Sequence, residues 1–377
     1  MRNNDWQIVE EISAEFLGDV LKKNWQIYKD SIAIKDLIFD NIQLDVSYNP
    51  FSINPESDGC NLILDMPVAM LSYGDGGGFN IFDNPGVLNI QFNINTKKVS
   101  VDVSELQIPK SYKGVVGIML SDYYKDNIYS LFVIFHNLKV FEINKYSLDM
   151  FPVKDNFIVN TSSGKLFLIR CHGCFKADRP SFDSFDFKED YICWLGHDFI
   201  REYVILPYLG SFLQCFNHSD LQRCNEGEYI FVDNYYYMNP INVGIDRYVP
   251  KLEGKKCNIR MYPSYIAVYL SGNVQVGCNA EEDFSVNLKI SVEKNGDDVV
   301  FSVDEDLNTE KSVPWYLYLS IGGGIAAEVV LSEANDKMIK VWNNVVKFTS
   351  NDYVVASGFN IDRCILNYEL GFALSRK

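Results

Sequence analysis

The sequence has no long apolar run. None of its segments reaches the ~18 consecutive apolar residues that a membrane-spanning helix requires. The opening letters, MRNNDWQIVEEI, are interrupted by acidic residues and do not form the apolar core of a signal peptide. We therefore expect a chain with no transmembrane segment, cytoplasmic as synthesised, for which release outside the cell without a signal peptide stays open.

Basic residues are scarce as well. Lys and Arg number 34 against 50 Asp and Glu, so the formal net charge is −16, and no run of Lys and Arg exceeds two residues. A net field of this sign repels the phosphates of nucleic acids and of anionic membranes at long range. We expect no nucleic-acid partner.

Residues and motifs that carry catalysis are also few. The chain has only four histidines and contains no G-x-S-x-G or H-E-x-x-H motif. The segment Gly322–Ala327 fits the dinucleotide-binding pattern G-x-G-x-x-A, but only residues 328–377 follow it, too few for the remaining strands of a Rossmann sheet. The sequence therefore predicts no enzymatic activity and no cofactor.

The nine cysteines are odd in number and scattered along the chain. Without a signal peptide, this pattern is typical of reduced, packed thiols. Cys171-x2-Cys174 followed by Cys193-x3-His197 has the ligand types and approximate spacing of a structural zinc site. Because Cys193 lies among apolar neighbours, we expect free, metal-free cysteines, and zinc binding by these four residues stays open.

The length and composition indicate a globular protein of two modules. Apolar residues make up 47% of the 377-residue chain and charged residues 22%. A domain of about 150 residues is typical, so two domains are expected. The segment DRPSFDSFDFKED, rich in Asp, Ser and Phe, suits an exposed connection. We therefore predict one module over residues 1–185 and a second over residues 186–377.

Three segments have the period of amphipathic helices. The first runs from Asp5 to Tyr28, with Asn4 and Gln7 resembling a capping box. The second begins near Asp198 and contains Pro207, which should bend it. The third runs from about Ile325 to Val346. Their stripes are Val9, Ile12, Phe16 and Val20; Phe199, Tyr203, Leu206, Leu209 and Leu213; and Ala327, Leu331, Ala334, Met338, Val341 and Val345.

Most of the rest has the alternation of β-strands. Leu88 to Ile94 alternates apolar and polar residues and returns through Val99 to Val103, which predicts a hairpin with one buried face. A second hairpin is predicted around Asn295-Gly296, and Tyr129 to Ile143 is predicted as strand. The fold class is α+β, with long amphipathic helices packed on strongly curved antiparallel sheets in an elongated molecule.

Three groups of residues carry a resemblance to a known family: the opening Asp5-Trp6-x-Ile8-Val9, the segment FIREYVILPYLGSFL, and the long polar-faced hairpins. Together they resemble the TULIP (tubular lipid-binding) superfamily, and within it the bacterial OrfX-type proteins encoded beside clostridial botulinum-like neurotoxins. The resemblance implies a helix packed into a curved antiparallel sheet, with a seam that can hold a lipid chain. It also implies lipid transfer, membrane contact or assembly with other proteins of the same toxin cluster.

No lipid-contacting residue of the superfamily can be matched to this sequence, so the candidate groove residues come from the helix stripes. A helix along the concave face of a curved sheet leaves an apolar channel wherever the volumes do not match. The alternative is a channel filled by aromatic side chains, in a protein-interaction scaffold with no lipid ligand; a β-rich surface or phage structural protein is a further reading. The candidate groove residues are Ile12, Phe16, Val20, Phe199, Tyr203, Leu206, Leu213, Leu331 and Met338.

Overall fold

The chain packs as two compact units in a computed structural model. The model describes residues 7–376 except 60, 75, 94–95, 97, 138–140, 144–152, 163, 174–187, 226, 277–279, 313–322, 344–345, 349–350 and 356–357. The N-terminal unit is Ile8–Cys193 with Val354–Asn360 and Ala373–Lys377. The C-terminal unit is Trp194–Tyr353 with Met1–Gln7 and Ile361–Phe372. Within the described residues, no helix is long and apolar enough to cross a membrane.

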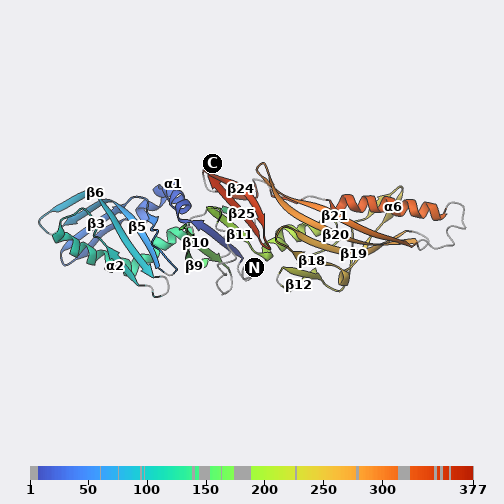
Figure 1. The fold of residues 1–377 in the computed structure, drawn as a ribbon, viewed down its shortest axis with the longest axis horizontal. Helices are drawn as coiled ribbons and strands as arrows, with labels where there is room; N and C mark the ends of the chain where they lie inside the picture. Colours follow the sequence, from blue (N-terminus) through green and yellow to red (C-terminus); the bar gives the residue numbers. More distant parts are fainter. Residues whose placement is uncertain are drawn as a thin grey trace. The chain divides into compact units, whose positions relative to one another are not determined.

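In the N-terminal unit, an antiparallel sheet has the strand order β2-β3-β5-β6-β7, with β4 beside β5. Figure 1 shows α1 and α2 alongside this sheet. Alternate residues such as Leu44, Leu64 and Ile90 are fully buried, so one face of the sheet forms the core. The elements are β2 Ile34–Phe39, β3 Ile42–Tyr48, β4 Ser52–Ile53, β5 Asn61–Gly74, β6 Phe79–Asn93, β7 Val99–Asp102, α1 Ala14–Ile32 and α2 Lys110–Asn137.

A second sheet of this unit contains β25, β11, β1, β10 and β9 in that order, with β24 beyond β25. The strands are β1 Ile8–Ser13, β9 Val153–Asn160, β10 Leu166–His172, β11 Tyr191–Leu195, β24 Phe359–Leu366 and β25 Leu370–Arg376. Three of them, β11, β24 and β25, contribute residues to both units. A short pair, β8 Phe141–Ile143 and β23 Tyr353–Val355, lies apart from it.

The C-terminal unit is built on a larger antiparallel sheet, ordered β12-β13-β18-β19-β20-β21-β22. The helix α6 Gly323–Trp342 contacts β19, β20 and β21. The strands are β12 Leu221–Asn225, β13 Glu228–Phe231, β14 Tyr235–Tyr237, β15 Ile241–Val243, β16 Asp246–Tyr248, β17 Lys251–Glu253, β18 Asn258–Met261, β19 Ile266–Val276, β20 Ala280–Asn295, β21 Asp298–Ser312 and β22 Val346–Phe348.

Both predicted hairpins are confirmed. Asn89 to Phe92 of β6 pairs with Val99 to Asp102 of β7. Strands β20 and β21 pair antiparallel through to Asn295 and Asp298, and Gly296 in the turn between them has φ +62. A glycine adopts this left-handed conformation at little steric cost, as a tight hairpin turn requires.

The predicted start of the first helix is wrong. Ile8–Ser13 is the strand β1, and α1 begins at Ala14, where the Ser13 hydroxyl accepts a hydrogen bond from the Phe16 amide at 3.1 Å. The proposed cap residue Asn4 lies outside the described residues. Every residue of β1 is buried, Glu10 and Glu11 included, so the strand lacks the alternation that would have revealed it.

A second prediction is overturned between Tyr129 and Ile143. This segment was predicted as strand, but α2 extends to Asn137, and among its described residues only Phe141–Ile143 is strand. Its aromatic and β-branched residues are of the types enriched in strands. In the preceding part of α2 the buried residues Val116, Leu120, Tyr124 and Ile128 recur every four positions, which is the period of a helix packed on a sheet, and the helix continues from there to Asn137.

The mid-chain and third helices differ from their predicted bounds. The mid-chain segment forms α3 His197–Ile200, the π-helical turn η3 Arg201–Ile205 and α4 Leu206–Gly210. The Leu206 amide bonds to the Arg201 carbonyl, five residues back. A proline has no amide hydrogen and crowds the preceding turn, so a π-turn before Pro207 is a physical consequence. The third helix ends at Trp342, and Val346 begins β22.

Candidate functional site

A pocket lies where α1 begins in the N-terminal unit. Its volume is about 350 Å³, near the lower end of the roughly 300–1,000 Å³ found for small-molecule sites. Segments far apart in the sequence form its walls: the start of α1, β4, the turn before β10, and Asp190. Its lining residues are Ser13, Ala14, Glu15, Ser52, Ile53, Pro55, Gly164, Lys165, Leu166 and Asp190.

Ser13 holds two of these walls together. Its side chain caps α1 through the Phe16 amide, and its own amide donates to the Asp190 carbonyl at 2.7 Å. A capping serine satisfies an amide that the helix leaves unpaired. The strand-to-helix turn at Ser13 therefore fixes Glu15 and Asp190 on the same opening.

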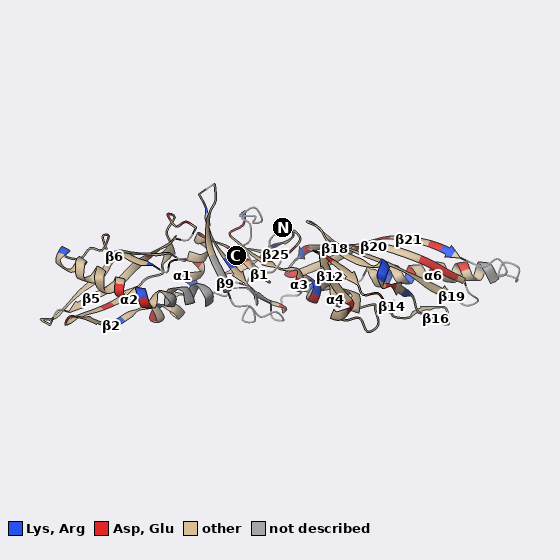
Figure 2. Ribbon diagram, turned by 90° about the horizontal axis from the view of Figure 1, so that it is seen from below, with Lys and Arg blue, Asp and Glu red and all other residues tan. Residues whose placement is uncertain are grey.

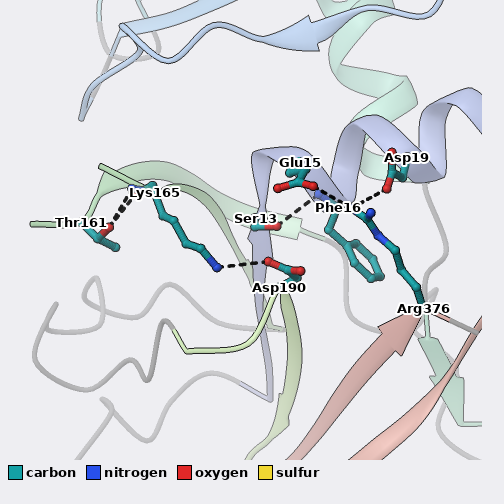
Figure 3. A network of polar contacts seen from close by, with 8 residues as sticks. All are labelled: Ser13, Glu15, Phe16, Asp19, Thr161, Lys165, Asp190 and Arg376. Atoms are coloured by element: carbon teal, nitrogen blue, oxygen red, sulfur yellow. Dashed lines mark hydrogen bonds and ion pairs between the residues drawn. The ribbon is translucent and has the colours of Figure 1, made fainter. Parts of the chain in front are cut away.

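Three ion pairs, made by Lys165 and Arg376, flank the pocket (Figure 3). Lys165 Nζ lies 3.4 Å from Asp190 Oδ1. The Arg376 guanidinium lies 3.1 Å from Glu15 Oε1 and 2.5 Å from Asp19 Oδ2. Exposed pairs of this kind contribute only about 0–1 kcal/mol to stability. Their charges can therefore exchange partners with a charged ligand group at little cost.

The wall behind these charges is apolar. Ile53 and Leu166, which line the pocket, are both buried. Phe16, the residue after Glu15, is fully buried, with its ring centroid 5.3 Å from that of Tyr191 and 4.4 Å from that of Phe359. The pocket thus combines charges of both signs at its rim with an apolar wall, the arrangement that suits an amphipathic ligand.

A buried polar cluster lies in the same unit. The Glu10 carboxylate accepts hydrogen bonds from Arg170 at 2.7 Å and from the Tyr191 hydroxyl at 2.6 Å, and His172 Nε2 lies 2.7 Å from it. Burial by itself raises the pKa of Glu10. The Arg170 charge and the hydrogen bonds from His172 and Tyr191 outweigh burial and hold that pKa at about 2. All four groups are buried, so we assign this cluster to stability.

Three of the predicted groove residues lie in the N-terminal unit. Ile12, Phe16 and Val20 are completely buried. Ile12 belongs to β1, not to the helix, so it does not share a helix stripe with the other two. The residues bracket the pocket-lining segment Ser13–Glu15, but they are packed among protein side chains.

The other predicted residues lie in the C-terminal unit. Phe199 and Tyr203 stack with ring centroids 4.8 Å apart, and Phe199 is buried while Tyr203 is half-buried. Leu206 is also half-buried, and Leu213 is buried beyond the end of α4, in a bridge with Met238. Leu331 and Met338 are fully buried on α6. The nine residues therefore form two separate sets, one in each unit.

The buried face of α6 contacts polar groups that the sequence pattern did not reveal. Asn335 Nδ2 donates to the fully buried carboxylate of Glu282 at 2.8 Å. The Tyr208 hydroxyl donates to the carbonyl of Trp342 at 2.6 Å. Among the described residues, Glu282 Oε2, Asn335 Oδ1 and Trp342 Nε1 have no hydrogen-bond partner. Extending the alternation of Phe284 and Val286 back by two residues would have placed Glu282 on the inner face.

The zinc hypothesis is not settled by the described residues, because Cys174 lies outside them. Cys171, Cys193 and His197 are buried. Burial raises the pKa of the Cys193 thiol well above its usual value and lowers the pKa of His197 to about 4. Within the described part of the chain, no three His, Cys, Asp or Glu side chains are grouped to hold a metal ion. Metal-free cysteines stay a prediction.

Comparison with known proteins identifies the fold. No protein-family model matches the sequence, and no curated protein matches it. The solved structure of P47 from Clostridium botulinum A2 is 10% identical, with a TM-score of 0.60 over 99% of this chain and 98% of that one. P47 of Clostridium botulinum E1 is 11% identical, with a TM-score of 0.60 over 100% of both chains. The chain therefore has the fold of clostridial P47, and its predicted resemblance to TULIP-type, OrfX-like proteins is confirmed at the level of fold.

Proposed function

We propose that the chain is a non-enzymatic, TULIP-like lipid-binding protein that holds a lipid or acyl chain between helix and sheet. The proposal includes a role as an accessory component of a bacterial toxin gene cluster, acting with other proteins of that cluster. The observation that carries it is the pocket at the start of α1, whose rim is charged and whose wall is apolar. The likeness to clostridial P47 over the whole chain supports the same reading.

In this proposal the polar end of the ligand lies between the ion pairs of Lys165 and Arg376, and its apolar end contacts Ile53 and Leu166. Each methylene moved out of water contributes about 0.8 kcal/mol. Phe16 is fully buried next to the pocket lining, so a long acyl chain enters the seam only as this ring moves aside. Ile12 and Val20 then line the deeper part.

The buried face of α6 is the proposed second lining. This lining would comprise Leu331 and Met338 on α6. The mid-chain segment of the same unit would add Phe199, Tyr203, Leu206 and Leu213. A buried carboxylate oxygen without a hydrogen bond is costly, so a ligand that donates to Glu282 Oε2 would relieve that cost.

A scaffold with a filled core is the second candidate function. The fully buried state of Ile12, Phe16, Val20, Leu331 and Met338 favours it. Side chains packed at the density of protein interiors leave no channel. In that case the chain acts by binding protein partners and has no lipid ligand.

The first test replaces Ser52, an exposed residue of the pocket wall, with tryptophan. The indole should occupy the cavity and leave the buried core in place. We expect the unmodified chain to bind a fluorescent fatty acid saturably and Ser52→Trp to bind it at least ~10-fold more weakly, a loss of about 1.4 kcal/mol. Fluorescence titration measures both affinities.

The matched control is Ser332→Trp, at an exposed position of α6, which should bind as the unmodified chain does. Equal binding by Ser52→Trp and the unmodified chain would show that the ligand does not bind in the α1 pocket. No saturable binding of any fatty acid or phospholipid by the unmodified chain would favour the filled scaffold.

A further inference from the structure

Large apolar side chains are exposed in two neighbouring hairpins of the N-terminal unit. Besides Phe39 at the end of β2, which is 43% exposed, they are Ile38 on β2, Met70 on β5, and Phe79 and Ile81 on β6, with exposed fractions of 68%, 37%, 58% and 62%. Single exposed apolar residues are ordinary on protein surfaces, whereas a contiguous group marks an interaction site. The strand register decides which of the two descriptions applies.

The register places Ile38 and Phe79 in one row across four strands. Ile38 pairs with Gln43, Gln43 with Gly74, and Gly74 with Phe79. Side chains of directly paired residues share a face and have Cβ atoms about 4.5–5.5 Å apart. Ile38 and Phe79 therefore face the same way, separated by Gln43 and by a residue with no side chain.

The Phe79 ring lies over Gly74. A Cβ atom built on Gly74 would be 2.8 Å from Phe79 Cε1, so the ring occupies the space that a side chain at position 74 would take. The ring therefore extends across β5 towards Gln43, which joins Phe79 to the row containing Ile38.

Ile81 and Met70 continue this surface in the next two rows. Ser72 pairs with Ile81 and with Asp45, and Met70 pairs with Asp83. A β-bulge lies between Val68 and Met70. Because a one-residue shift moves side chains to the other face, the bulge turns Met70 outward.

The helices cover the opposite face of the sheet. Leu44, Leu71 and Tyr73, which alternate with the outward residues, are buried. Tyr73 stacks on Tyr112 of α2, with ring centroids 4.4 Å apart. The face with Ile38, Met70, Phe79 and Ile81 is therefore the one that α1 and α2 leave uncovered.

Acidic residues surround this apolar group. Asp45 and Asp83 lie at outward positions of β3 and β6. Asp36 joins them through hydrogen bonds, since its amide donates to Asp45 Oδ1 at 2.6 Å and its carboxylate accepts from Gln43 Nε2 at 2.7 Å. In Figure 2 acidic positions on the strands are drawn red. None of the residues paired in these three rows is Lys or Arg; Lys35 lies beside Asp36 in the β2 bulge opposite Asp45.

We propose that this surface is a docking site for a protein segment that presents apolar side chains flanked by Lys or Arg. We call it the outward patch, defined as Ile38, Met70, Phe79 and Ile81 with Asp36, Asp45 and Asp83. Charge complementarity selects the partner: the local acids and the net charge of −16 repel an anionic lipid surface and attract a basic one. The partner's apolar residues would cover the exposed side chains in the two hairpins.

The probe is a synthetic amphipathic helical peptide of Leu and Lys, and its binding to the protein is measured by fluorescence anisotropy. We expect the full chain to bind it, and the double variant Phe79→Ser/Ile81→Ser to bind at least ~10-fold more weakly. Asp45→Asn/Asp83→Asn should also weaken binding and should reduce its dependence on salt. Ile118→Ser, at a 54%-exposed position of α2 in the same unit, is the control and should bind as the unmodified chain does.

Ile38→Lys supplies an independent variant, because it adds a repelling charge and leaves the Phe79 ring over Gly74. It should weaken binding of the Leu/Lys peptide as well. The proposal fails if Phe79→Ser/Ile81→Ser and Ile38→Lys both bind that peptide as the unmodified chain does, or if a matched Leu/Glu peptide binds the unmodified chain as tightly. It also fails if sedimentation shows that the patch variants abolish self-association, which would make a second copy the occupant. Patch-dependent binding of phosphatidylglycerol vesicles would contradict it by identifying a lipid surface.

Discussion

Replacing Phe16 with alanine should lower the free energy of unfolding by about 3–5 kcal/mol, the range for large-to-small changes in a core. Phe16 is completely buried on α1 and contacts the rings of Tyr191 and Phe359, from strands far away in the sequence. The substitution would leave a cavity where α1, β11 and β24 meet. Urea unfolding, monitored by circular dichroism, measures the change in the free energy of unfolding.

Ile27→Ala is the matched control for this prediction, because Ile27 lies on the same helix and is 71% exposed. It should alter the urea midpoint little. An unchanged midpoint for Phe16→Ala would show that the helix does not pack on this face.

Replacing Arg170 with methionine should destabilise the chain by a similar amount, about 3–5 kcal/mol. The Arg170 guanidinium lies 2.7 Å from the carboxylate of Glu10, and both side chains are buried. Removing one partner leaves a buried carboxylate without its counter-charge. Lys125→Met, which removes an exposed pair with Asp122, should change stability by no more than about 1 kcal/mol.

This variant should also change the response to acid. The pKa of Glu10 is held at about 2 in the folded chain, below its ordinary value of 4.5. The stability that this group contributes is therefore present above pH 4.5 and is lost as the pH falls from 4.5 through about 2. Without the Arg170 charge the pKa of Glu10 is lowered less, because only His172 and Tyr191 still oppose burial, so the contribution of Glu10 should fall less over this range. An unchanged acid profile in the variant would contradict the assignment.

The long hairpins were predictable because each has one buried and one wet face. The pair β20–β21 alternates apolar and polar residues, and Asn295-Gly296 supplies the turn. β1 was not predictable in this way. It lies between β11 and β10, and Glu10 is buried there because Arg170, 160 residues away in the sequence, neutralises it. No local pattern carries that information.

The candidate site was predictable only in part. The helix stripe identified Phe16 as core and brought the prediction close to the pocket. The charged rim could not be inferred. Lys165 and Asp190 come to line the same pocket as Glu15, and Arg376 comes to pair with Glu15, only after the chain has folded. The division into modules 1–185 and 186–377 stays a prediction. In the structure β11, β24 and β25 each contribute residues to both compact units.

The proposed lipid ligand is tested most directly by native mass spectrometry of the purified chain, paired with lipid analysis of its organic extract. We expect a population heavier than the chain by the mass of a lipid, which returns to the chain mass on denaturation in organic solvent. We also expect Ser52→Trp to carry less of that lipid. A chain of unmodified mass, with an extract no richer in lipid than a mock purification, would contradict lipid binding.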